Sequence, residues 1–600
     1  MNSLDWAVLI GYFGVMVAIG AWSHRRVADV SDFFTAGGRM PWWLSGISHH
    51  MSGYSAVMFT GYAGIAYQYG ITSYVTWSFP IAVGIAIGAR LFAGRLNRLR
   101  SRLGVASPLE YLKDRYNLST QQALAWSGVL LKIVDVGAKW AAIATLLTVF
   151  TGISLNQGIL LTGVITGIYC TVGGLWADAL TELGQFVIQL LAGVAMVVTV
   201  LGELGGVSGL WTLWDRLPAG HAQPTAGPYT VTFLLAYLFI KTFEYSGGMW
   251  NQAQRYMATR TAREARRSAL LSAALWFVWP VVLFFPMWAA PLLVTSGKPD
   301  ASDAYALLSE RLLPHGLLGL VVVGFFSHTM AMCSSDANAI AAVFTWDIAP
   351  AVSARARAWS HRAGLVAARL STVCFLALSM AIATQVNSPA FKDIITVVIK
   401  WVAGLVGPVS IPFLLGMVPL FRRSGPTAAL VSWAAGLVAF WLTNYGLAGV
   451  QLQVQIVAPV ATSLVLFVLL GLVRPEPSAA RDALLARIND GNDLDDGDDG
   501  DDGAPRTGRP GPRRCRTGPD LRGGGGQARG SGPASRRRSP PGRAGRGPGS
   551  SPWRSRRRVA GWWRGPPARR ASWGAVRSRR AGRRGGCRRR RRWSRCRRRG

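Results

Sequence analysis

The chain is organised as long apolar runs separated by short polar loops. A membrane-spanning helix needs roughly 20 predominantly apolar residues. The pattern predicts an all-α integral membrane protein with about 13 transmembrane helices, from apolar runs at residues 3–22, 41–70, 74–94, 119–150, 154–172, 175–201, 229–254, 267–294, 316–347, 363–385, 391–420, 426–446 and 454–473.

The run at residues 41–70 is interrupted where a spanning helix would cross the bilayer centre. His49, Ser52, Gly53 and Ser55 lie in its middle. Glycine and serine there would free backbone groups that lipid cannot satisfy. Interrupted spans are typical of transporter binding sites. A continuous helix that tolerates small residues at a helix contact is the alternative.

A second run, at residues 229–254, has the same broken character. Gly247 and Gly248 fall late in it, beside Glu244 and Asn251. An odd number of predicted spans, five, separates the starts of the two broken runs, so the second unit has to be inverted in the membrane. Inverted repeats led by broken helices place a substrate site near the midplane.

Basic residues mark the cytoplasmic loops of membrane proteins. Here they follow the odd-numbered runs, which predicts a multi-pass protein of the cell membrane with its N-terminus outside and its C-terminus in the cytoplasm. The markers are Arg25, Arg26, Arg39, Arg95, Arg98, Arg100, Arg102, Lys113, Arg115, Arg255, Arg260, Arg263, Arg266, Arg267, Arg355, Arg357, Arg362, Arg422, Arg423 and Arg474.

The composition supports a membrane protein with an unusual tail. Half of the residues are hydrophobic, yet the net charge is +36. Residues 503–600 hold 33 arginines, no lysine and one acid, after a linker rich in aspartate. Such a segment predicts disorder, and we interpret it as a frameshift product or otherwise unselected sequence. Binding of RNA or anionic lipid is the alternative, but no nucleic-acid partner is expected.

These patterns predict five consecutive segments. They are a leading helix and loop (1–40), a first inverted repeat (41–228), a second inverted repeat (229–425), two additional helices (426–480) and the acidic then arginine-rich tail (481–600).

Five motifs in the apolar region resemble the sodium:solute symporter family, which includes sodium/glucose, sodium/proline and sialic-acid transporters. The resemblance covers roughly residues 3–475 and implies a five-plus-five inverted repeat of the leucine-transporter type. It also implies sodium as the coupling ion. The motifs are DFFTAGGRMPWWLSGIS at Asp32–Ser48, RLGVASPLEYLKDRY at Arg102–Tyr116, YCTVGGLWADALTELGQFVI at Tyr169–Ile188, GGMWNQAQRYM at Gly247–Met257 and SSDANAIAAVFTWDI at Ser334–Ile348.

The resemblance implies that Glu182, Ser334 and Ser335 form a sodium site. Family members with an additional ion site have Thr-Asp where this chain has Thr181-Glu182. A hard cation prefers oxygen ligands and a balancing charge. A solvated or protonated carboxylate near the cytoplasmic end of its helix is the alternative for Glu182.

The family's more widespread sodium site is degenerate in this chain. It would use backbone at Met51, Tyr54 and His328, but Ala331 and Met332 replace its two hydroxyls. A thioether is a poor ligand for sodium. His328 could instead carry a proton, because imidazole titrates near neutral pH, or it could be a packed neutral residue.

The resemblance also implies a solute cavity with aromatic and thioether walls. Such walls with a few polar groups suit a small polar organic solute. The expected cavity residues are His49, His50, Gly53, Tyr54, Met58, Met249, Trp250 and Asn251.

Charged residues also occur inside two of the apolar runs. Lys132, Asp135 and Lys139 share one helix face, as do Lys241 and Glu244. Structural pairing and a role in substrate binding or gating are both open.

We therefore predict a sodium-coupled symporter of a small organic solute, in contact with membrane lipid. No Walker loop or other enzyme constellation is visible, and neither a cofactor nor a metal other than sodium is expected. The alternatives are proton coupling through Glu182 or His328 and a transporter-like membrane sensor.

Overall fold

The computed structural model describes residues 1–23, 27, 30–294, 300–385, 400–401, 404 and 406–490. The predicted arginine-rich tail and part of the predicted span at residues 391–420 (391–399, 402–403 and 405) lie outside these residues. The described elements are helical. They are α1 (Ser3–Ser23), α2 (Val30–Thr35), α3 (Trp42–Met51), α4 (Ala63–Tyr69), α5 (Phe79–Gly88), α6 (Gly94–Leu103), α7 (Leu112–Arg115), α8 (Leu118–Thr151), α9 (Leu155–Glu203), α10 (Gly209–Arg216), α11 (Val231–Phe243), α12 (Trp250–Ala258), α13 (Ala262–Leu293), α14 (Ala304–Leu312), α15 (Leu317–Val343), α16 (Ala349–Val352), α17 (Ala354–Arg357), α18 (His361–Ala383), α20 (Ile411–Leu415), α21 (Pro426–Trp441), α22 (Leu452–Val473) and α23 (Ala479–Asn489).

The fold is that of an all-helical membrane protein. Within the described residues, nine helical stretches are long and apolar enough to cross a membrane. The sequence predicts about 13 spans, which is more than these nine, and the reasons for the difference can be located in the chain. The runs at 154–172 and 175–201 are counted together as the 49-residue element α9, although the backbone at Gly174 is not helical and divides α9 into two helices at the boundary between the two runs. The two broken runs divide into shorter helices and are therefore not among the nine.

The bend in α9 is located by a glycine. Gly174 has φ 54° and ψ −147°, and a side chain there would meet the Phe33 backbone oxygen at 2.6 Å. Only glycine accepts both the positive φ and the close approach. The start of α9 is fixed separately, because Ser154 and Gln157 form a capping box that satisfies the first backbone amides.

The two broken runs have the interrupted form that the sequence predicts. α3 ends at Met51, and the chain resumes as the π-helical turn Met58–Tyr62 before α4. α11 ends at Phe243, and Gly247, with φ 112°, separates it from α12. Both breaks are buried in the protein, as non-helical backbone at membrane depth requires.

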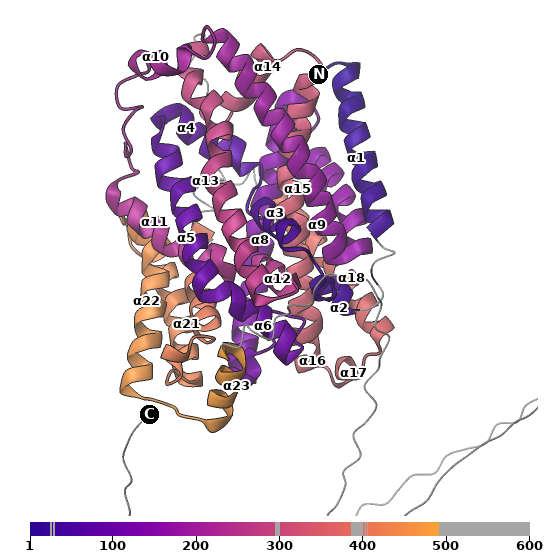
Figure 1. Ribbon diagram of the computed structural model, residues 1–600, viewed down its shortest axis with the longest axis vertical. Helices are drawn as coiled ribbons and strands as arrows, with labels where there is room; N and C mark the ends of the chain where they lie inside the picture. The colour runs from indigo at the N-terminus through magenta and orange to yellow at the C-terminus, as the bar shows by residue number, and fades with distance from the viewer. Residues whose placement is uncertain are drawn as a thin grey trace, which may run out of the picture. The chain divides into compact units, whose positions relative to one another are not determined.

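The helices pack side by side around these breaks (Figure 1). α15 packs most extensively against α9, and α3 packs against α13 and α9. The start of α1 lies at the same end as α10 and α14, whereas α16, α17 and α23 lie at the opposite end. The centre of the bundle is therefore enclosed by α3, α9, α12 and α15.

Candidate ion and solute site

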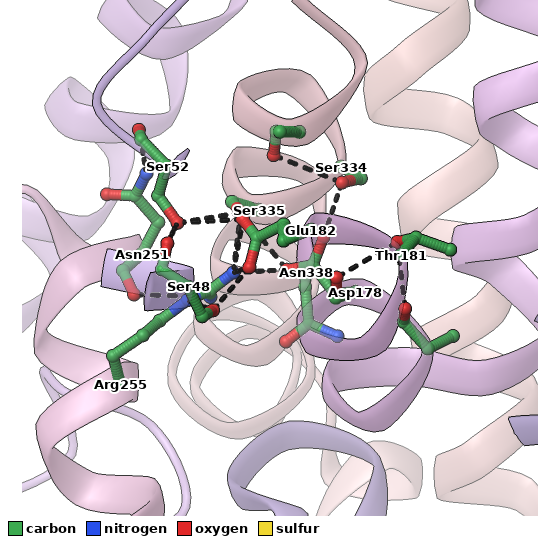
Figure 2. Close-up of polar contacts among 12 residues, drawn as sticks. Ser48, Ser52, Asp178, Thr181, Glu182, Asn251, Arg255, Ser334, Ser335 and Asn338 are labelled. Atoms are coloured by element: carbon green, nitrogen blue, oxygen red, sulfur yellow. Dashed lines mark hydrogen bonds and ion pairs between the residues drawn. The ribbon is translucent and has the colours of Figure 1, made fainter. Parts of the chain in front are cut away.

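A buried arginine lies at the centre of the bundle between two carboxylates (Figure 2). The Nη2 atom of Arg255 donates to Asp178 and lies 3.2 and 3.3 Å from the two carboxylate oxygens of Glu182. All three side chains have no exposed surface. Buried charges of this kind are kept only when they are paired.

Four serine hydroxyls surround these charged groups. Ser335 lies 2.5 Å from Arg255 Nη2, 2.7 Å from Glu182 Oε1 and 3.1 Å from Asp178 Oδ2. Ser334 donates to Asp178, and Ser48 donates to Glu182 while accepting from Arg255 Nε at 2.9 Å. Ser52 lies 2.9 Å from Glu182 Oε1. We call the set Asp178, Glu182, Arg255, Ser48, Ser52, Ser334 and Ser335 the ion centre.

The ion centre joins the two broken runs to the continuous helices α9 and α15. Asp178 and Glu182 are one turn apart on α9 and therefore share a face. Ser48 lies on α3 just before the first break, and Arg255 lies on α12 just after the second break. A cation bound here would thus contact segments on both sides of the interruptions.

The structure brings together the three residues that were expected to bind sodium. Glu182, Ser334 and Ser335 converge, and Glu182 is fully buried rather than solvated. The sequence interpretation missed Asp178, which could have been found from its one-turn spacing to Glu182.

Some of the basic residues used as loop markers are buried among other parts of the protein. Arg255 and Arg115 are both fully buried. Arg255 pairs with the carboxylates, whereas Arg115 donates to the backbone oxygens of Gly416 and Phe421 at 2.8 and 2.9 Å. A count of basic residues by sequence position cannot separate such internal partners from cytoplasmic charge.

The residues of the degenerate ion site do not form a comparable oxygen cluster. Ala331 is buried, and Met332 is half-buried. His328 donates or accepts through Nδ1 to the Gly324 oxygen at 2.6 Å, and its ring lies 5.5 Å from that of Tyr54. The nearby hydroxyl of Thr329 accepts from the Ala56 amide at 2.8 Å.

The expected solute-cavity residues separate into different environments. His49 is held by Ser272 and Tyr256 at 2.8 and 2.9 Å. Trp250 packs toward Gly128 of α8, where an added side chain would meet its ring. Asn251 donates to the backbone oxygen of Ser52 at 3.5 Å. The other expected members, His50, Gly53, Tyr54, Met58 and Met249, are buried beside the two breaks.

A second buried charge cluster links α8 to α15. Lys132 and Lys139 each contact both Asp135 and Asp336, at 2.7 to 3.2 Å. We call these four residues the lysine–aspartate ring. The sequence predicts that Lys132, Asp135 and Lys139 lie on one helix face, and they are in contact. It does not predict their contact with Asp336. Lys241, on α11, forms an ion pair with Glu244, which lies in the break after α11. The distance from Nζ to Oε2 is 2.5 Å.

Broken membrane helices around a buried cluster of oxygen ligands define a secondary transporter. The model of the Sodium:solute symporter family matches residues 33–436, so the chain belongs to this family. The protein is therefore a sodium-coupled solute symporter and not an enzyme.

Curated relatives and a solved structure agree with the family. The chain is 26% identical over 466 residues to the sodium/sialic acid symporter NanT of Aliivibrio fischeri, covering 74% of this chain and 88% of the relative. It is 24% identical to the sodium/glucose cotransporter of Vibrio parahaemolyticus, covering 58% and 69% respectively. A structure described as the substrate-bound outward-open state of a Na⁺-coupled sialic acid symporter matches with a TM-score of 0.68 at 21% identity. That match covers 79% of this chain and 99% of the other, and it shows the shared fold.

Proposed function

We propose that sodium binds at the ion centre and that it does so in exchange for the Arg255 guanidinium. The observation that carries this proposal is the contact of one nitrogen, Nη2, with Asp178, Glu182 and Ser335 together. The guanidinium occupies the position at which carboxylate and hydroxyl oxygens converge. A small hard cation prefers the same set of ligands.

The charge balance of the centre favours a second cation. Asp178 and Glu182 bring two carboxylates, while Arg255 brings one positive charge. In a low-dielectric interior, an uncompensated carboxylate is costly. Sodium supplies the missing charge, and the hydroxyls of Ser48, Ser52, Ser334 and Ser335 supply neutral oxygens.

The exchange gives a physical route from ion binding to movement. Arg255 lies on α12, directly after the second break, and its Nε contacts Ser48 on α3. Sodium that displaces the guanidinium would weaken the link between α12 and the α3–α9 face. A ligand shifts a conformational equilibrium only through such differences in contacts between states.

The finer topology is also part of the proposal. We propose thirteen spans arranged as two inverted units of five, 41–228 and 229–425, with one helix before them and two after. We also propose an outside N-terminus in the cell membrane. The end of the bundle with α16, α17 and α23 supports this orientation, because Arg355 and Arg357 lie there.

The transported solute is proposed to be a small organic molecule, as for the sialic acid and glucose symporters that the chain resembles. At a membrane potential of about 100 mV, one sodium ion contributes roughly 2.3 kcal/mol to uptake. That energy supports a concentration gradient of about fortyfold.

The test is equilibrium binding of radioactive sodium to the purified full-length protein, comparing wild type with Glu182→Gln. Glutamine keeps the shape and removes the charge. Loss of a charge-assisted contact costs roughly 1.5–3 kcal/mol, so sodium affinity should fall about tenfold to over a hundredfold. Glu203→Gln, on the same helix but exposed, is the matched control. If Glu182→Gln bound sodium with unchanged affinity, sodium would not bind at the ion centre.

A further inference from the structure

A groove lies between α9 and α18 on the surface of the bundle. The two helices pack against each other, and the groove between them has a volume of about 420 Å³. We call it the α9–α18 groove. Its lining includes Gly163, Gly167, Thr171, Val373, Leu376 and Met380. Val164 and Ile168 also line it and are 47% and 49% exposed, so the groove opens toward the lipid that surrounds a membrane-spanning bundle.

Gly167 keeps the groove open. An added side chain at Gly167 would meet only Leu376 Cδ1, at the ordinary contact distance of 3.7 Å. At Gly163, one turn earlier, an added side chain would meet Met380 Sδ at 1.9 Å. Met380 therefore packs directly on Gly163, whereas the space over Gly167 is large enough for a further group.

Thr171 brings an unused hydroxyl to the groove. Three other threonines of α9 donate to the carbonyl oxygen one turn earlier, at 2.7 to 2.9 Å, namely Thr162, Thr166 and Thr199. The hydroxyl oxygen of Thr171 is buried and has no hydrogen-bond partner among the described residues. A buried polar group without a partner is costly. The hydroxyl therefore indicates a ligand that accepts or donates a hydrogen bond at the level of Thr171.

Positive charge lies at the same end of the groove as Thr171. Arg369 of α18 donates from Nη2 to the backbone oxygen of Val172, at 3.3 Å. Arg362 is exposed in the first turn of α18, and α17, which carries two more arginines, precedes it at the same end of the bundle (Figure 1). Among the described residues that line the groove, none is charged. The groove is thus apolar along its length and bordered by arginines at one end.

The length of the groove fits one leaflet of a bilayer. Arg369 and Met380 are eleven positions apart on α18, which corresponds to a rise of about 16 Å. The hydrocarbon core of a bilayer is roughly 30 Å thick, so the groove covers about half of it. A transmembrane helix of a second copy would cross both leaflets, whereas an acyl chain ends near the midplane. The length therefore favours a lipid as the occupant.

We infer that the α9–α18 groove is a binding site for an anionic phospholipid. One acyl chain lies over Gly167, an ester oxygen accepts a hydrogen bond from Thr171, and the phosphate lies beside Arg369 and Arg362. Guanidinium groups suit phosphate because they can donate two parallel hydrogen bonds to it. Lipid tails are as apolar as the groove, so the fit of the chain and the charge of the headgroup select this lipid, and not the hydrophobic effect.

The experiment titrates the purified, delipidated full-length protein in detergent with dioleoyl phosphatidylglycerol or with dioleoyl phosphatidylcholine. Native mass spectrometry counts the lipid molecules bound to each protein. The expected result is a saturable site for phosphatidylglycerol that binds phosphatidylcholine about fivefold more weakly, as one arginine at a lipid headgroup contributes. Equal affinities for the two lipids would overturn the inference.

Substitutions in the groove locate the bound lipid. Gly167→Leu fills the space of the acyl chain, so the saturable site should be lost. Gly14→Leu is the matched control, because Gly14 is exposed on α1 and an added side chain there meets nothing within 4 Å. Gly167→Leu protein that binds phosphatidylglycerol as wild type does would place the lipid elsewhere and overturn the inference.

The polar end of the groove is tested with conservative variants, which also serve if Gly167→Leu does not fold. Thr171→Val should weaken phosphatidylglycerol binding about two- to tenfold. Thr199→Val should not, because the Thr199 hydroxyl already donates within α9. Arg369→Gln should abolish the preference for phosphatidylglycerol, and Arg369→Lys should keep it. Unchanged binding in both Thr171→Val and Arg369→Gln would contradict the proposed headgroup position.

The oligomeric state of the same samples separates a lipid from a second copy of the chain. The lipid site predicts that Gly167→Leu keeps the oligomeric state of wild type while it loses phosphatidylglycerol. If Gly167→Leu instead dissociated an oligomer and left phosphatidylglycerol binding unchanged, the groove would be a protein interface and the inference would be wrong.

Discussion

Two of the buried charge clusters among the described residues include consecutive residues of α15, and they differ in composition. The lysine–aspartate ring pairs two ammonium groups with two carboxylates, by direct contacts of 2.7 to 3.2 Å. The ion centre pairs one guanidinium with two carboxylates and adds four serine hydroxyls. Ser335 and Asp336 are consecutive residues, yet they belong to different clusters.

We propose that this difference separates a structural link, the lysine–aspartate ring, from a binding site, the ion centre. A balanced set of ion pairs has no need of a further charge, so the ring ties α8 to α15. An unbalanced set with spare neutral oxygens attracts a cation and can exchange one positive group for another. Both clusters are buried, so burial does not distinguish them. They differ in the ratio of positive to negative groups and in the presence of serine hydroxyls.

The largest expected effect is a loss of stability when one carboxylate of the lysine–aspartate ring is removed. Asp336→Asn leaves Lys132 and Lys139 with a single carboxylate in the protein interior. Removing one partner of a buried pair costs about 3–5 kcal/mol, so the melting temperature of the purified protein should fall steeply. Adding Lys139→Met restores the charge balance and should recover much of the loss. Equal melting temperatures for the single and double variants would contradict the ring as a balanced structural link.

The next effect is on sodium affinity, from Asp178→Asn in the ion centre. Arg255 and Glu182 would then form a balanced pair, with no surplus charge to attract sodium. We expect affinity to fall about tenfold to over a hundredfold, from a loss of roughly 1.5–3 kcal/mol. Radioactive sodium binding provides the measurement. The Asp336→Asn, Lys139→Met protein is the comparison, since its sodium affinity per folded molecule should stay close to wild type.

A smaller effect is expected from Ser334→Ala. A neutral hydroxyl contributes less than a charged ligand, about 0.5–1.5 kcal/mol, which corresponds to a change of about two- to tenfold in sodium affinity. Ser327→Ala, whose hydroxyl donates to the Val323 oxygen of its own helix, is the control on α15. A loss for Ser334→Ala as large as that for Asp178→Asn would mean that charge does not dominate the site.

The sequence anticipated the helical membrane fold and both breaks, because apolar length and misplaced glycines are local signals. It also anticipated the convergence of Glu182 with Ser334 and Ser335, through the family motifs. It did not anticipate Arg255 or Asp336 as partners. Each pairs across more than 70 positions of sequence, and no local periodicity reports such a contact. Arg255 also lies close in the sequence to other basic residues that were used as loop markers.

The most direct test of the account is sodium binding to Arg255→Gln, measured on the purified full-length protein alongside its melting temperature. If sodium and the guanidinium exchange at one position, removing the guanidinium leaves two carboxylates that only sodium can balance. The account predicts tighter sodium binding, by about tenfold or more, and a melting temperature that rises with sodium far more than in wild type. A folded Arg255→Gln protein with unchanged or weaker sodium affinity would contradict the exchange.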